Sequence, residues 1–267
     1  MKILVPIDFS ENANNALEFA KKLAAKNKAS ITLLYAFYAV YDFAAQAAEI
    51  ISQIEQDARQ AMKKIAESTG REGLQVDYRI LQGTVASTVA SYASREEYDL
   101  IVMGTQGASG IKKALIGSNT GHVIKESKVP VLAIPSNAGI ENVKEISVAL
   151  ELANEEEKHF QQIFRLTQGL DLPYHFFHVN QQNSFEKQIE FRGLEVYLKE
   201  KYPALHFSFE TLRGSNPEHG IEDYLANHPQ TILTMISKNK TFFEYLFNKS
   251  HTLQMAYHTH VPLLVVK

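Results

Sequence analysis

The sequence predicts an α/β protein with two tandem doubly wound parallel sheets of five strands each, a Rossmann-like fold. Short apolar runs such as Ile31–Phe37 and Asp99–Met103 are typical of buried strands. Segments with apolar residues at helical spacing separate these runs. Strands joined through helices require right-handed crossovers, which give a parallel sheet covered on both faces. The pattern restarts near residue 144, which indicates a repeated domain.

The first half alternates strands and helices from its first residues onward. The opening MKILVPIDFS reads as a strand and not as a signal peptide, because Asp8 follows the apolar run so closely. We expect Ser10 to cap a helix and Gly70 to end a second, longer one. The expected strands are Lys2–Ile7, Ile31–Phe37, Leu74–Leu81 near one edge, Asp99–Met103 and Val131–Ile134. The expected helices follow Ser10, lie within Ala44–Ser68, contain Val85, Val89 and Tyr92, and follow the cap Ser118.

Composition limits the possible functions. A chain of 267 residues is long enough for two domains of about 130 residues. The net charge of −3 gives no reason to expect nucleic acid or an anionic membrane as a partner. The lack of cysteine excludes disulfides, thiol catalysis and thiolate metal ligands. No apolar run approaches the ~20 residues of a membrane span, and we expect a cytoplasmic protein.

A glycine-rich segment, Gly104–Thr120, lies between an expected strand and an expected helix. Backbone N–H groups are unpaired at such a junction, and the helix dipole favours an anion there. Gly104 and Gly107 have no side chains, so the backbone can close on a ligand. The run Gly117–Asn119 offers N–H groups and a hydroxyl to phosphate oxygens. We therefore expect a phosphate site, with a glycine connection that binds nothing as the alternative.

Three separate strands are expected to end at one crevice, since Asp8, Phe37 and Gly104 all lie at carboxyl ends. A charge such as Asp8 behind an apolar strand costs free energy unless it faces a cleft or a partner. Its alternative role is to cap the next helix, for which Ser10 is better suited. Pro6 is tolerated only at the edge or end of a strand. The side chain of Phe37, judged from the sequence alone, suits the core.

The glycine spacing G-x2-G-x9-G-[ST] and the opening ILVPIDFSENANNAL resemble the universal stress protein family. ATP-binding members of that family carry this motif at this place in the fold, and the chain has no Walker A motif G-x4-G-K-[ST]. The resemblance implies ATP, with Mg²⁺, as the ligand and a regulatory or protective role under stress. It also implies that Pro6 lines the adenine pocket, that Asp8 accepts hydrogen bonds from adenosine, and that the Phe37 backbone contacts adenine. The implied binding residues are Pro6, Asp8, Phe37, Met103, Gly104, Gly107, Gly117, Ser118, Asn119 and Thr120.

The second half matches the first in the same order at nearly constant offset, which favours duplication over chance similarity among apolar strands. The matched segments are Glu145–Leu152 with Lys2–Phe9, Leu212–Gly214 with Leu81–Gly83, and His260–Val266 with Lys128–Ile134. We place the domains at residues 1–137 and 144–267, with a linker at 138–143.

The second copy has lost the glycines of the phosphate motif. Ile236, Asn239 and Lys249 stand at the places of Gly104, Gly107 and Gly117, Ala149 stands at that of Pro6, and Glu151 at that of Asp8, while Ser250 is retained opposite Ser118. Side chains then fill the space that a phosphate needs. We therefore expect one nucleotide per chain.

The final strand of each half is short, apolar and preceded by Val-Pro. Exposed edge strands invite pairing, and the resemblance implies dimerisation through this strand. We expect Val131–Ile134 to pair with Leu263–Val266 inside the chain, so that one chain mimics a family dimer. A homodimer is a further alternative.

Catalytic and metal-binding residues are not evident in the sequence. Without a nucleophile, general base or oriented triad, we expect at most slow ATP hydrolysis. The alternatives are a true ATPase or nucleotide alpha hydrolase, and a scaffold whose second crevice binds a lipid-like ligand or a protein. All histidines except His122 lie in the second half. His251 and His258 are two helical turns apart with no flanking carboxylate pair, so we expect no specific metal site, although metal binding by these histidines stays open.

Overall fold

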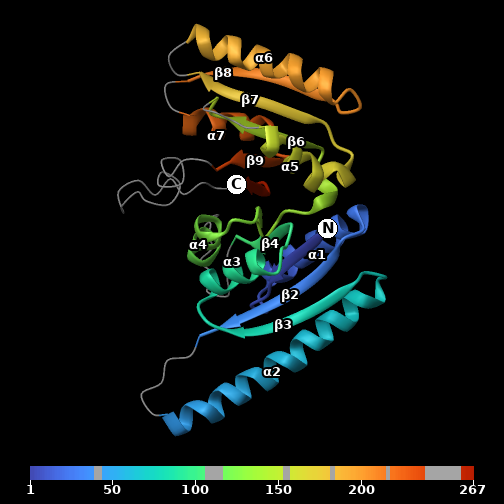
Figure 1. The fold of residues 1–267 in the computed structure, drawn as a ribbon, viewed down its shortest axis with the longest axis vertical. Helices are drawn as coiled ribbons and strands as arrows, with labels where there is room; N and C mark the ends of the chain where they lie inside the picture. Colours follow the sequence, from blue (N-terminus) through green and yellow to red (C-terminus); the bar gives the residue numbers. More distant parts are fainter. Residues whose placement is uncertain (39–43, 106–116, 153–156, 181–183, 215–216, 238–259) are drawn as a thin grey trace.

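The computed structural model describes residues 1–38, 44–105, 117–152, 157–180, 184–214, 217–237 and 260–267 (Figure 1). The first half contains β1 (Lys2–Pro6), α1 (Glu11–Asn27), β2 (Ser30–Phe37), α2 (Ala44–Arg71), β3 (Val76–Gln82), α3 (Val85–Arg95), β4 (Leu100–Gly104), α4 (Ser118–Glu126) and β5 (Val131–Ile134). The second half contains β6 (Glu145–Leu150), α5 (Glu157–Thr167), β7 (Tyr174–Asn180), α6 (Phe185–Lys201), β8 (Phe207–Arg213), α7 (Pro217–Asn227), β9 (Thr231–Ile236) and β10 (Leu263–Val266). Two short 3₁₀ helices are η1 (Ile140–Asn142) and η2 (Gln168–Leu170).

The described strands form a single ten-stranded sheet in the order β3-β2-β1-β4-β5-β10-β9-β6-β7-β8 (Figure 1). Neighbouring strands within each half are parallel. The one antiparallel pair among them is β5 with β10, where the halves meet. The predicted doubly wound parallel halves are confirmed, and they join edge to edge.

Helices cover both faces of this sheet, as a doubly wound fold requires. Residues of α1, α2, α5 and α6 pack into one apolar cluster, and residues of α3, α4 and α7 pack into the other. Each cluster draws on both halves. Leu132 and Leu264 belong to the first cluster, while Val131 and Val265 belong to the second. The apolar core is therefore continuous from one half to the other on both faces.

Backbone angles repeat between the halves. Phe9 and Leu152, which follow the first strand of each half, have φ of 62° and 53°. Lys28 and Asp171, which precede the second strand of each half, have φ of 51° and 54°. Few residues other than glycine adopt positive φ, so their coincidence at matched positions supports a duplication.

The halves are joined by antiparallel pairing of β5 and β10, which confirms the predicted pairing of the two final strands. Leu132 lies opposite Leu264, and Val131 lies opposite Val265. All residues of both strands are buried. Each strand supplies the partner that the other would lack as the edge of a separate sheet.

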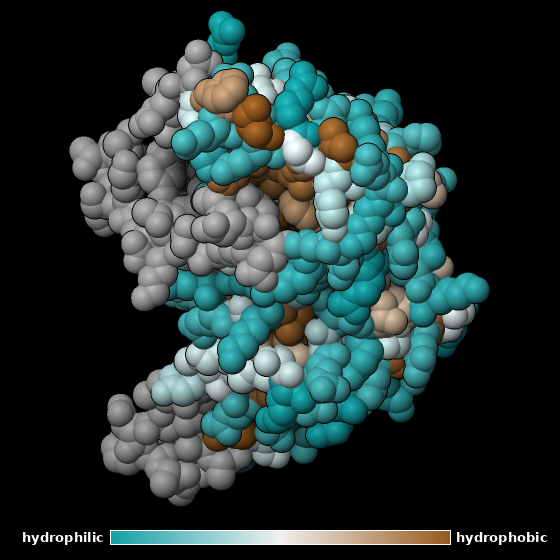
Figure 2. All heavy atoms as spheres, turned by 45° about the horizontal axis from the view of Figure 1, so that its top comes forward, coloured by the Kyte–Doolittle hydropathy of each residue, from teal (hydrophilic) through white to brown (hydrophobic). Residues whose placement is uncertain are grey.

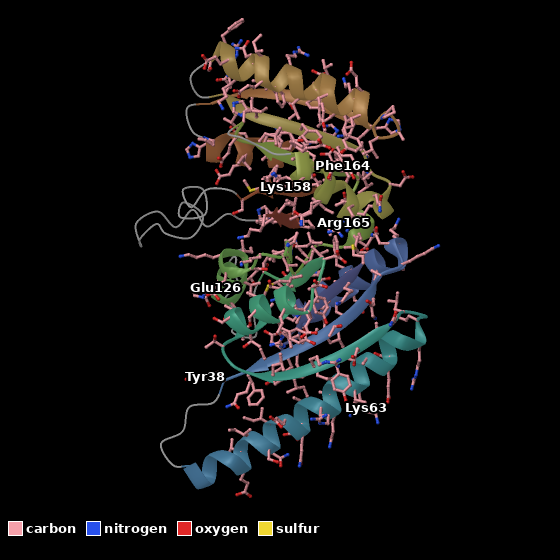
Figure 3. The ribbon with its side chains drawn as sticks, viewed as in Figure 1. Tyr38, Lys63, Glu126, Lys158, Phe164 and Arg165 are labelled. Atoms are coloured by element: carbon pink, nitrogen blue, oxygen red, sulfur yellow. The ribbon has the colours of Figure 1, made fainter. Side chains whose placement is uncertain are left out.

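Polar contacts also fix the connection between the halves. The side-chain amide of Asn15 on α1 donates to the carbonyls of Pro135 (2.8 Å) and Ala138 (3.0 Å). Arg165 on α5 lies at the border between the halves (Figure 3) and forms a 2.6 Å ion pair with Asp99 of the first half. The connection therefore packs along α1 instead of spanning free solvent.

The predicted start of α1 is confirmed, whereas the predicted end of α2 is wrong. The Ser10 hydroxyl accepts a hydrogen bond from the Ala13 N–H (3.1 Å), so the predicted cap of α1 is confirmed. In contrast, α2 does not end before Gly70 but continues through it to Arg71. Gly73, with φ of 84°, is the glycine that adopts the left-handed conformation beyond this helix.

The surface in view in Figure 2 is mainly hydrophilic, with hydrophobic residues in small groups. The outermost strands, β3 and β8, expose alternate residues to solvent, and for β3 the sequence alternation predicts this edge position. No helix in the described part of the chain is long and apolar enough to cross a membrane.

We expect the apolar strand pairing to hold the halves together more strongly than the ion pair. Leu132→Ala removes a buried side chain opposite Leu264 and should lower the free energy of unfolding by about 2–5 kcal/mol. Arg165→Ala removes an ion pair whose arginine side chain is 54% exposed and should lower it by less than ~1 kcal/mol. Urea unfolding of both variants measures the difference, and equal losses would contradict this account.

Candidate functional site

A pocket of about 320 Å³ opens at the carboxyl ends of β1 and β4. This edge is where ligands bind in doubly wound sheets. Residues from the strand ends, from α1 and α3, and from the first turn of α4 line it. They are Pro6, Ile7, Asp8, Ala13, Leu34, Ala36, Val85, Val89, Met103, Gly104, Gly117, Ser118, Asn119 and Thr120.

Asp8 lies at the pocket just beyond β1, and its side chain is exposed. Its Oδ1 accepts hydrogen bonds from the Ser10 N–H (3.0 Å) and from the Ser10 hydroxyl (2.5 Å). The left-handed φ of Phe9 between them turns the chain sharply toward α1. Ser10 is the helix cap, so Asp8 is positioned by the cap and is not the cap itself.

Gly104 ends β4 at the base of the pocket, and the structure gives it a packing role. A Cβ at this position would lie 2.9 Å from the carbonyl oxygen of Asn12 on α1. Such a distance is too short for a real Cβ contact, so any side chain would force α1 and β4 apart. The missing side chain therefore serves the approach of a helix, whereas the sequence suggested only the approach of a ligand.

The first turn of α4 forms the polar end of the pocket. The helix begins at Ser118 with Gly117 as its N-cap residue, so Ser118 is not the cap that the sequence predicts. Glycine is among the residues found at this position, although it has no side chain to accept a hydrogen bond from the first turn. The N–H groups of the first turn have no partner within the helix, and the positive end of the helix dipole lies here.

Two hydrogen bonds hold the end of β4 against this turn. The Gly117 N–H donates to the carbonyl of Thr105 (2.5 Å), and the Thr120 hydroxyl donates to the carbonyl of Gly104 (2.7 Å). At the other end of α4, Glu126 (Figure 3) accepts a 3.0 Å hydrogen bond from the Ser87 hydroxyl on α3. Of the helices that line the pocket, α3 and α4 are thus tied to each other, and α4 is tied to the sheet. Gly107 lies outside the described residues.

Phe37 does not line the pocket. Its side chain is buried and stacks on Tyr35, with ring centroids 6.1 Å apart. Its carbonyl accepts a 2.8 Å hydrogen bond from the Gly83 N–H. Successive strand residues face opposite sides, so Ala36 lines the pocket and Phe37 packs on the other face. The sequence expectation of a core side chain fits this placement.

Apolar wall residues are the part of the site that sequence reasoning missed. They are Ile7, Ala13, Leu34, Ala36, Val85 and Val89. A signal existed for two pairs of them. Leu34 and Ala36 are two residues apart on a strand, and Val85 and Val89 are four apart on a helix, so each pair shares a face.

The corresponding place in the second half carries a larger side chain on its second strand. Its residues pack together in one buried cluster, namely Phe177, Val179, Ile221, Tyr224 and Met235. By the register of the strand pairs, Phe177 takes the place of Leu34. Its ring stacks on that of Tyr224, with centroids 3.9 Å apart and planes 14° apart. At Gly220, an added Cβ would lie 2.7 Å from the side chain of Val179, so the packing leaves no spare room there.

The first-half pocket thus has an apolar body, one carboxylate and the start of a helix. Among the described residues that line it, Asp8 alone carries a formal charge. Pockets that bind small molecules are mostly apolar with a few placed polar groups. This arrangement can hold a flat apolar ring system in the body and an anion at α4.

Comparison with known proteins gives the family. The sequence profile described as the universal stress protein family matches residues 1–135. A universal stress protein of Methanocaldococcus jannaschii is 31% identical over 140 residues, which cover 50% of this chain and 81% of that protein. One from Thermus aquaticus is 30% identical over 133 residues, which cover 49% of this chain and 96% of that protein.

The structural comparison covers both halves. The crystal structure of a universal stress protein from Archaeoglobus fulgidus DSM 4304 covers 100% of this chain and 98% of its own, with a TM-score of 0.77 and 19% identity. At that identity the likeness concerns the fold. Together with the sequence matches in the first half, it shows that the chain belongs to the universal stress protein family and contains two copies of that fold.

Proposed function

We propose that the first half binds ATP, with Mg²⁺, and that the chain acts in the cytoplasm as a regulatory or protective protein under stress. The observation that carries this proposal is an apolar pocket that ends at the first turn of α4. Adenine fits the apolar body beside Leu34, Ala36 and Val89. Asp8 lies where a carboxylate can accept hydrogen bonds from the ribose hydroxyls. The triphosphate then reaches the N–H groups of residues 118–120, where the helix dipole favours an anion.

We further propose a division of labour between domains at residues 1–137 and 144–267, with the linker at 138–143. Support comes from Phe177, a larger side chain at the place of Leu34, which stacks on Tyr224. Ile236 also restores a side chain at the position of Gly104. The second half would then have no room for adenine, and one chain would bind one nucleotide.

Slow or absent hydrolysis is part of the proposal. Activation of a water molecule needs a general base close to the γ-phosphate. The described residues around the first turn of α4 are glycine, serine, asparagine and threonine, which have no basic group. Nucleotide would therefore act by being bound and released.

Gly117→Lys tests the phosphate end of the pocket. Gly117 has φ of −62° and ψ of 158°, which any residue can adopt, so the variant should fold while its side chain enters the pocket. We expect ATP binding in the micromolar range for the parent and a loss of two to four decades in the variant, because two good hydrogen bonds to a charged group are worth about 3–6 kcal/mol. Calorimetric titration measures both affinities.

Gly193→Lys on α6 is the matched control. It makes the same change on a helix surface, where an added Cβ meets nothing within 4 Å, and it should bind ATP like the parent. Equal affinity of Gly117→Lys and the parent would refute the proposed phosphate site.

The same titration tests the division of labour. We expect binding to the parent to saturate at one equivalent of ATP per chain, because Phe177 and Ile236 stand where the first half has Leu34 and Gly104. The Gly117→Lys chain should then show no tight binding of its own. A second equivalent in the parent, or one full equivalent remaining in the variant, would show that the second half binds nucleotide.

A further inference from the structure

Three metal-ligating side chains from separate elements meet in the second half. Glu145 is the first residue of β6, His175 is the second residue of β7, and His228 follows the last residue of α7. One ligand atom of each lies within 4.8 Å of one ligand atom of both others. They gather at the amino ends of the strands, whereas the first-half pocket lies at carboxyl ends.

The distances within this cluster are close to those around a metal ion. Nε2 of His175 lies 3.4 Å from Oε2 of Glu145, and Nδ1 of His228 lies 2.6 Å from Oε1 of Glu145. Zn²⁺ with ligands at about 2.0–2.2 Å in a tetrahedron keeps ligand atoms roughly 3.3–3.6 Å apart. The His175–Glu145 distance already falls in this range. The His228–Glu145 distance of 2.6 Å would have to lengthen by about 0.7–1.0 Å to reach it.

The three side chains of the cluster are partly buried. The side chains of Glu145, His228 and His175 are 16%, 25% and 32% exposed. An ion can therefore enter, and a fourth position remains for water. Two imidazoles and one carboxylate are a donor set that binds Zn²⁺ and other divalent transition metals.

Packing holds the ligands in place before any ion arrives. The backbone N–H of His228 donates to the backbone carbonyl of Tyr224 (3.0 Å). The rings of the two residues stack, with centroids 4.1 Å apart and planes 8° apart. Tyr224 stacks in turn on Phe177. The Tyr224 hydroxyl lies 3.0 Å from the Ser147 hydroxyl on β6. Ser147 is two residues from Glu145 and therefore lies on the same face of the strand. Such support is what a metal site needs from its surroundings.

The first half offers an internal comparison at the same three places. The register of the strand pairs and the ends of α3 and α7 match Glu145 with Lys2, His175 with Thr32, and His228 with Glu96. There the Lys2 ammonium donates to the carbonyl of Glu96 and ties the strand to the end of the helix. An ammonium at this place excludes a cation. In the second half, Glu145, His175 and His228 stand in place of Lys2, Thr32 and Glu96. The first half shows that the fold itself does not require metal ligands at these three positions.

We propose that Glu145, His175 and His228 form a site for a divalent transition metal, of which Zn²⁺ fits best, with water at a fourth position. The bound ion would tie β6, β7 and the end of α7 together, as the Lys2 contact ties the first half. The site is independent of the nucleotide pocket. Sequence reasoning missed it because it sought ligands at helical spacing, whereas these three come from different elements.

Titration of the chelator-treated full chain with ZnCl₂ tests this proposal. The parent should bind one Zn²⁺ at this site with a rise in the melting temperature. Loss of an outer-shell partner alone typically weakens metal binding 10–100-fold, so loss of a ligand in Glu145→Gln, His175→Gln or His228→Gln should weaken it by at least about 100-fold. His206→Gln, which removes an exposed histidine of the same half, is the matched control and should bind like the parent.

Co²⁺ supplies a second readout, since its visible absorption bands are intense in a four-coordinate site. The parent and His206→Gln should show these bands, and the three ligand variants should lack them while keeping the far-ultraviolet circular dichroism of the parent. Because the three ligands come from different elements, a variant that fails to fold can be set aside while the other two still decide. Parent-like Zn²⁺ affinity in the ligand variants, or no binding to the parent, would overturn the proposal and leave a hydrogen-bonded cluster only.

Discussion

The antiparallel pairing of β5 with β10 is the contact on which the architecture depends. Each strand is too short and too apolar to remain at a solvent-exposed edge, and each is buried along its whole length by the other half. The pairing also carries both apolar clusters across the junction, so the core is continuous on both faces of the sheet. The halves therefore share a continuous core, and the duplication is visible in the fold as well as in the sequence.

Within this shared frame the halves have diverged at both ends of their strands. At the carboxyl ends, the first half keeps small or aliphatic residues such as Ala36 and Leu34 around a pocket, while the second half places Phe177 at the position of Leu34. At the amino ends, the first half uses an ammonium contact from Lys2, while the second half gathers two imidazoles and a carboxylate. A duplicated fold permits such differences, because the common core does not depend on either end.

The sequence predicted most of the fold, because strand and helix periods, the repeated segments and the Val-Pro strands are local signals. Residues 117–120, which line the polar end of the pocket, are consecutive in the chain, so the sequence alone could group them. It failed where three-dimensional packing decides. The position of Gly104 against Asn12 depends on the path of α1, and the side facing the pocket at Ala36 depends on strand register. The cluster around Glu145 joins three elements that no sequence spacing relates.

The place of β10 in the sheet has a consequence for how the chain folds. β10 lies between β5 and β9, and its partner residues on β5 precede it by about half of the chain, as the pair Val131 and Val265 shows. Contacts between such distant residues form slowly, because the closure entropy of a long loop opposes them. During synthesis, the strand edges of β5 and β9 that pair with β10 remain unpaired until β10 has been made. Removal of residues 263–266 would therefore leave β5 and β9 as two unpaired, apolar edge strands. Such edges pair with other chains and favour aggregation.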